Sequence, residues 1–248
     1  MNSSISKESD AIKNTKNPAY LSRYFFVGMA LFLMLFVVLG FGSTYGLQLL
    51  LGKEISGAGV VEADWALHMH SVVFGGWVLL LIVQAALIAS GKVQKHMAIG
   101  KTLGIGAAVA VVISGVIIVV VQDSAIIREG IATWAEWPIM LRFLAGSIVA
   151  LINFSILFYL GLRNRYQPVP HKRYMFFATI TLVIAATSRM NYLLGPDPWP
   201  GQIGTFLMVA PIIGYDLFSA GRIHKSTLIG TAIVWGAVII FDLLDLIG

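Results

Sequence analysis

The stretch ALHMHSVVFGGWVLLLIVQAALIAS, residues 66–90, decides the fold of this chain. It contains no Asp, Glu, Lys or Arg, and about 20 apolar residues are enough for a helix to cross the hydrocarbon core of a bilayer. The stretch therefore predicts a transmembrane helix. Its two histidines, His68 and His70, lie near the start of that helix, and ionisable residues inside a membrane span indicate a functional site.

The rest of the chain has the same character. Of 248 residues, 58% are hydrophobic and 12% are charged, whereas soluble domains carry about 25% charged residues. Hydropathy predicts an all-α polytopic transmembrane helix bundle of about seven spans. The spans are expected at about 24–51, 66–90, 100–121, 138–162, 173–195, 201–220 and 226–247.

Basic residues in the loops predict the orientation of these spans. One set of loops, with the N-terminal tail, holds most of the lysines and arginines: Lys7, Lys13, Lys16, Arg23, Lys92, Lys95, Lys101, Arg163, Arg165, Lys172, Arg173, Arg222 and Lys225. The opposite loops hold only Lys53 and Arg128. The positive-inside rule then puts the N-terminus in the cytoplasm and the C-terminus outside. We expect a polar cytoplasmic tail over residues 1–21 and a single transmembrane domain over 22–248, in a bacterial inner membrane.

Composition also excludes several classes of protein. The chain has no cysteine, so disulfides, thiolate metal sites and c-type haem attachment are excluded, and no metal site is assigned. The net charge of +5 comes from bases in short loops, where they set orientation, so the expected partner is the lipid bilayer and not nucleic acid.

Ionisable side chains from four expected helices are predicted to lie in one layer under the outer surface. These are His68, His70, Arg142, Arg189 and Asp242. Counted from the helix ends at 1.5 Å per residue, His70, Arg142 and Arg189 lie about 6–9 Å deep. Charges inside a membrane indicate a functional site, so we predict a ligand-binding layer. The alternative is structural, because arginines near helix ends can extend to the headgroups and aspartates can end a helix.

The pair His68 and His70 cannot serve one axial ligand site, because residues two apart on a helix point about 200° away from each other. His70 shares a stripe with Phe74 and Trp77, so His70 is expected to face the bundle. Gln84, further along the same helix, is expected to make a hydrogen bond between helices.

A second set of histidines lies on the cytoplasmic side, where His96, His171 and His224 each precede an expected span. Two imidazoles on facing helices can hold a haem iron axially, and His96 with His171 is the geometry that allows one haem b. The alternative is that these histidines lie in wet loops, where they need no ligand. Asp216 is expected to pair with Arg222, to cap the following loop or to exchange protons.

Three segments of the sequence carry a resemblance to known membrane proteins. They are His68-Met69-His70 with Trp77, Gln84 and Lys95-His96; His171-Lys172-Arg173-Tyr174-Met175 with Arg189; and Tyr215-Asp216 with Gly221-Arg222-Ile223-His224. Together they resemble uncharacterised multi-helix proteins of bacterial inner membranes. The His-Lys-Arg-Tyr-Met stretch is distantly similar to small membrane proteins of cytochrome oxidase assembly, and this resemblance implies a respiratory or other membrane complex as partner.

Three functions follow from these patterns. The first is a redox- or proton-linked protein that holds a quinone-like or haem-related group in its outer polar layer. The second is a transporter of ions or small solutes, for which Pro211 predicts a broken helix. The third is a non-catalytic assembly or anchoring subunit. Whether any reaction is catalysed stays open.

Overall fold

The computed structural model describes residues 18–42, 46, 50, 65–128, 137–190 and 200–247, which are helical apart from the short turns between helices. The helices are α2 (Pro18–Phe41), α4 (Trp65–Ala89), α5 (Val93–Ile99), η2 (Gly100–Gly104), α6 (Ile105–Arg128), α7 (Trp137–Arg163), α8 (Pro168–Arg189), α10 (Pro200–Ala220) and α11 (Lys225–Ile247). No strand occurs in these ranges, so the predicted all-α class is confirmed.

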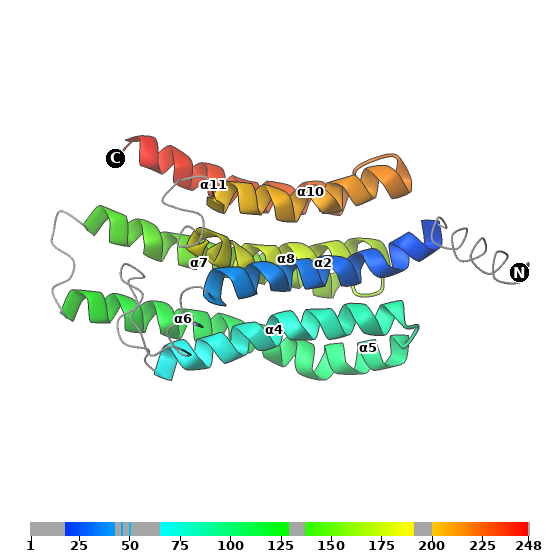
Figure 1. The fold of residues 1–248 in the computed structure, drawn as a ribbon, viewed down its shortest axis with the longest axis horizontal. Coiled ribbons are helices and arrows are strands. Elements are labelled where there is room, and N and C mark those ends of the chain that lie inside the picture. Colours follow the sequence, from blue (N-terminus) through cyan, green and yellow to red (C-terminus); the bar gives the residue numbers. More distant parts are fainter. Residues whose placement is uncertain are drawn as a thin grey trace, which may run out of the picture.

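Three of these helices form one continuous rod. The junction residues Gly100 and Ile105 have right-handed helical dihedrals, so α5, the π-helical turn η2 and α6 continue into one another. The described chain therefore forms seven long rods, which lie roughly along the long axis of the molecule (Figure 1). We name the two ends of the bundle after their histidines: α4 begins at the His70 end, and the turn from α4 to α5 lies at the opposite, His96 end.

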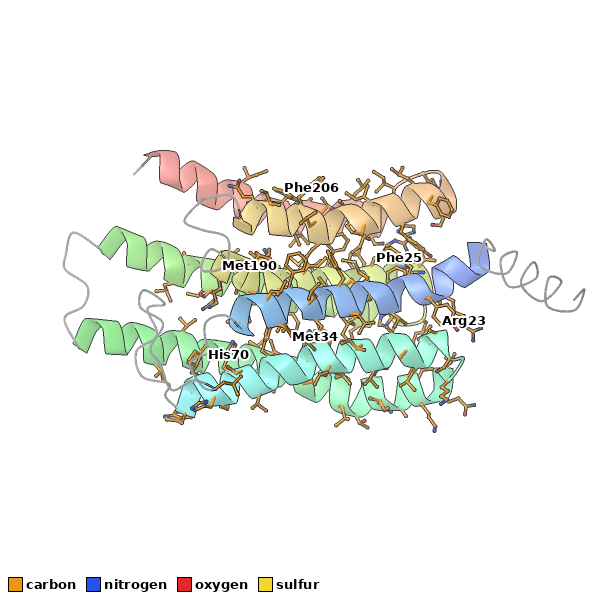
Figure 2. The ribbon with its side chains drawn as sticks, in the orientation of Figure 1. Arg23, Phe25, Met34, His70, Met190 and Phe206 are labelled. Atoms are coloured by element: carbon orange, nitrogen blue, oxygen red, sulfur yellow. The ribbon has the colours of Figure 1, made fainter. Side chains whose placement is uncertain are left out.

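Five of the rods are long and apolar enough to cross a membrane. They are Arg23–Phe41, Trp65–Ala89, Val93–Val121, Leu144–Arg163 and Gln202–Ala220. Their outward positions are aliphatic or aromatic, as Leu31, Val72, Val120 and Phe206 show, and Figure 2 shows Phe206 on the outer side of α10. Apolar side chains on the outside of a bundle face lipid and not water, so the chain is a membrane protein.

The helix at the centre of the bundle is α8. It packs against α2, α7, α10 and α11, and Trp77 of α4 donates a hydrogen bond from its indole Nε1 to Thr179 Oγ1 at 3.1 Å. Residues 176–183 are all buried, which covers more than two turns and thus every face of the helix. Protein surrounds α8, so threonines such as Thr179, Thr181 and Thr187 replace the aliphatic residues that a lipid-facing helix needs.

Glycines let the neighbouring helices approach α8 closely. Gly40 of α2, Gly161 of α7, Gly204 of α10 and Gly230 of α11 each lie where a Cβ atom would collide with an atom of α8. At Gly40 that atom is the backbone oxygen of Ala186, which a rotamer change cannot move. Small residues at such crossings are a general basis of helix packing in membranes.

Three helices begin at least five residues earlier than the sequence predicts. One is α2, which begins at Pro18 and not at residue 24. The rod expected from residue 100 begins at Val93, because Gly91 adopts φ +73° and closes the turn after α4 within a few residues. The helix expected from residue 173 begins at Pro168, because a proline in the first turn leaves no N–H without an acceptor. The latter two differences each move a histidine, His96 or His171, out of an expected loop and into a helix.

Candidate functional site

His70 faces the bundle interior, as its stripe with Phe74 predicts. Its Nδ1 lies 3.2 Å from the hydroxyl oxygen of Ser114, a buried residue of α6. The Ser114 hydroxyl donates its proton to the carbonyl of Val111 at 3.1 Å, so the same oxygen accepts from Nδ1–H of His70. This tautomer leaves Nε2 of the neutral imidazole as an acceptor.

Arg189, the last residue of α8, lies in the same cluster of side chains as His70. Its guanidinium carbon lies 4.9 Å from the centre of the Phe41 ring, and Nη1 donates to the carbonyl of Ala185 at 2.7 Å. Phe41 in turn meets Phe74 edge-on at 5.6 Å. Helices α2, α4, α6 and α8 thus bring an imidazole, a serine hydroxyl, a guanidinium and two aromatic rings to one end of the bundle. Figure 2 labels His70 and Met190, the neighbour of Arg189, at this end.

Of the five side chains predicted for this layer, the structure therefore brings His70 and Arg189 together. His68 is partly buried, two residues earlier in α4. Arg142 and Asp242 belong to α7 and α11, and their side chains lie outside the described residues. For Arg142 and Asp242 the predicted role stays a prediction.

At the opposite end, His96 of α5 and His171 of α8 face each other. Their ring centres are 6.2 Å apart and the ring planes cross at 82°. Both residues are partly buried within helices, so the interpretation of these two histidines as loop residues is wrong. The reason is the early start of both helices, which carries each imidazole into the bundle.

The Nδ1 atoms of both imidazoles are hydrogen-bonded. The Gly100 N–H and the His96 carbonyl assign the orientation of the Gln84 amide, since the amide oxygen must face the donor and the NH2 group the acceptor. In this orientation Nε2 donates to Nδ1 of His96 at 2.6 Å and to the His96 carbonyl at 3.2 Å, and the oxygen accepts from the Gly100 N–H at 2.9 Å. Nδ1 of His171 lies 2.8 Å from the carbonyl oxygen of Gly161 at the end of α7. The predicted interhelical hydrogen bond of Gln84 is confirmed, and its partners are His96 and Gly100.

A buried ion pair that the sequence did not reveal joins α8, α10 and α11. Nε and Nη2 of Arg173 donate to the carboxylate of Asp216, whose Oδ2 also accepts from the Thr227 hydroxyl and from the His224 N–H at 2.9 Å. Asp216 is 0% exposed and Arg173 is 3% exposed. The predicted pairing of Asp216 with Arg222 is therefore wrong, whereas the predicted cap on the following loop is confirmed by the bond to His224.

The sequence predicts that Arg173 and its neighbour Lys172 are basic residues of a loop. In the structure Nζ of Lys172 lies 4.3 Å above the Phe26 ring and donates to the Tyr215 hydroxyl at 3.3 Å. Both bases lie in the first turns of α8 and point into the bundle. A helix counted from Pro168 places both Lys172 and Arg173 in its first turns, so the prolines are the sequence signal for their burial.

His224 is the last residue of the loop before α11. Its Nδ1 accepts from the backbone N–H of Ser226 at 3.2 Å, so the imidazole caps the helix start. Burial, together with the charges of Arg173 and Arg222, lowers the pKa of His224, although Asp216 acts in the opposite direction.

Among the described residues, no group of three or more His, Cys, Asp or Glu side chains is placed to hold a metal ion. Comparison of the chain with models of known protein families, with curated proteins and with solved structures finds no match.

Proposed function

We propose that this protein binds a quinone-like ring at the His70 end and exchanges a proton with the ring's oxygen. The observation that carries the proposal is the convergence of His70 and Arg189, from two different helices, on the adjoining rings of Phe74 and Phe41 within a membrane bundle. A ring oxygen of such a ligand is a carbonyl in the oxidised form and a hydroxyl once an external electron donor has reduced the ring, and only the proton of that hydroxyl is exchanged here. Nε2 of His70 accepts from the hydroxyl, and the positive charge of Arg189 stabilises the oxygen after the proton has left.

The aromatic surroundings suit the same ligand. Phe74 lies 6.1 Å from His70 with the rings tilted by 30°, and Phe41 lies beneath the guanidinium of Arg189. Flat rings pack favourably against such side chains in offset or edge-on arrangements. A quinone-like ring fits better than haem, since the only other histidine at this end is His68, on the same helix and on another face.

The loop bases favour a cytoplasmic His96 end, and hence a cytoplasmic N-terminus, an external C-terminus and seven spans. On this orientation the His70 end faces the outside of a bacterial inner membrane. A proton released from the ring then has a short path to the external water.

The transporter alternative loses one of its supports, because α10 continues as a helix from Pro200 to Ala220 with Pro211 inside it. No described observation favours a moving or broken helix. The assembly-subunit alternative differs from our proposal in one measurable respect, since a scaffold keeps its function when the His70 end loses its polar groups.

Ligand binding to the purified protein in lipid nanodiscs tests the proposal. Titration with a short-chain ubiquinone, followed by quenching of tryptophan fluorescence, gives the dissociation constant. We expect His70→Ala to weaken binding about tenfold, because loss of a buried hydrogen bond costs about 1–3 kcal/mol. Arg189→Gln is expected to weaken binding by a similar factor.

His68→Gln is the matched control, since it removes an imidazole from the same helix on a different face. It should leave the dissociation constant within about twofold of the wild-type value. Equal binding by the wild type, His70→Ala and Arg189→Gln would remove the His70 end as the binding site.

A further inference from the structure

The two histidines at the His96 end have complementary tautomers. Nδ1 of His96 accepts a hydrogen bond from Gln84, so the proton of the neutral ring lies on Nε2. Nδ1 of His171 faces a carbonyl oxygen, which can only accept, so its proton lies on Nδ1 and Nε2 is unprotonated. One ring thus offers an N–H donor and the other offers a lone pair.

The ring centres of His96 and His171 lie too far apart for a direct hydrogen bond between the two imidazoles. A direct N–H···N bond of about 3 Å brings the ring centres to about 5 Å or less, whereas these centres are 6.2 Å apart. When two polar groups face each other beyond hydrogen-bond reach, a bridging oxygen satisfies both. The atom that suits a donor on one side and an acceptor on the other is a hydroxyl oxygen, because it both accepts and donates.

We propose that His96 and His171 bind a single hydroxyl group between their Nε2 atoms, with His171 as its base and His96 as its hydrogen-bond donor. When the hydroxyl O–H bond breaks, the proton bonds to Nε2 of His171 and the electron pair stays on the oxygen, which accepts from Nε2–H of His96. The resulting imidazolium keeps its bond from Nδ1–H to the Gly161 carbonyl. The hydroxyl belongs to water or to the ring of a lipid-soluble quinol. This site is separate from the one proposed at the His70 end.

The hydrogen bonds of Gln84 argue against the predicted haem b at this place. An axial ligand coordinates iron through an unprotonated nitrogen, so His96 would have to move its proton from Nε2 to Nδ1. Gln84 would then have to turn its amide. Its oxygen would face the His96 carbonyl and its NH2 group would face the Gly100 N–H, and both contacts repel.

Nitrogen-15 NMR of histidine-labelled protein in lipid bilayers tests the tautomers directly. We expect the Nε2 signal of His96 to be of the protonated type and that of His171 to be unprotonated, assigned by His96→Gln and His171→Gln. If either variant fails to fold, labelling of glutamine as well assigns His96 through its contact with Gln84. Protonated Nδ1 and bare Nε2 on both rings would overturn the proposal.

The role of Gln84 has a matched control on the neighbouring helix. Gln84→Leu removes the donor to Nδ1, so His96 should lose its single tautomer and show both. Gln94→Leu makes the same change at an exposed position two residues before His96 and should leave the spectrum unchanged. A wild-type His96 spectrum in Gln84→Leu would contradict the assigned role of Gln84.

Proton–nitrogen correlation spectra identify the bridging hydroxyl. A cross-peak between Nε2–H of His96 and water, unchanged by a short-chain ubiquinol, assigns the hydroxyl to water, whereas its replacement by a quinol proton assigns it to the ring. Absence of both cross-peaks would refute the bridge. A haem absorption band in the purified protein that disappears in His96→Gln would also refute the proposal, because it would show that these histidines bind haem iron and not a hydroxyl.

Discussion

Removing the carboxylate of Asp216 is the most informative perturbation of the fold. Asp216→Ala leaves the guanidinium of Arg173 buried without its counter-charge and takes an acceptor from the Thr227 hydroxyl and the His224 N–H. Breaking a buried ion pair by removing one partner costs about 3–5 kcal/mol. With 0% and 3% exposure, Asp216 and Arg173 belong to that class, so we expect a loss of this size.

The double variant Arg173→Met/Asp216→Leu separates the cost of an unpaired charge from the worth of the pair. It replaces both ions with apolar side chains, and such replacements are often neutral or stabilising. We therefore expect it to recover most of the stability that Asp216→Ala loses. Arg222→Met is the control, because it removes an exposed arginine from the same loop region and should change stability by less than about 0.5 kcal/mol.

Unfolding by SDS in mixed micelles, followed by loss of helical circular dichroism, measures these differences. For a chain of this length a loss of 3–5 kcal/mol also lowers the melting temperature by about 6–20 °C. A loss below about 1 kcal/mol for Asp216→Ala, or a double variant as unstable as the single one, would show that the buried charge is not the cause.

Two further predictions concern packing and pH. Gly40→Ala should destabilise the protein by about 1–3 kcal/mol in the same assay, because its Cβ would collide with the Ala186 backbone oxygen. Gly28→Ala on the same helix has open space and should be neutral or stabilising by up to about 1 kcal/mol, and equal losses at both glycines would refute the packing argument. The pKa of His224 is lowered by burial and nearby arginines, so the unfolded chain takes up the proton first and stability should fall as the pH drops below about 6.5. His224→Asn keeps a cap for the Ser226 N–H at every pH, so its stability should fall less between about pH 7.5 and pH 5.5, and an identical pH profile would exclude His224 as the cause.

Hydropathy predicted the lipid-facing parts of the fold well, because those helices are apolar on the outside and are bounded by strong turn signals. One such signal is Gly91, which closes the turn after α4 with a positive φ. The start of α8 was predicted too late, because hydropathy does not favour the segment with Pro168 and Pro170, although both prolines are compatible with a first helical turn. Because the predicted start lies five residues too late, Arg173 was predicted to be a loop residue although it is buried in the helix.

The direction of a site residue could be predicted only where the pattern of residues within its own helix is sufficient. The stripe that contains His70 and Phe74 gave the inward direction of His70, and the structure agrees. The partner of Asp216 could not be found in this way, because Arg173 is 43 residues away in the chain and Arg222 is a nearer candidate. Charge pairs between distant helices depend on which helix occupies the centre, and that is a property of packing.

The central position of α8 has a consequence for biogenesis. Arg173 emerges from the ribosome 43 residues before Asp216, so its guanidinium has no counter-charge from α10 while α8 is being made. The ion pair that joins α8 to α10 can therefore form only after Asp216 has been synthesised. The contacts that hold the start of α8 in place are complete only when α11 has also supplied Thr227.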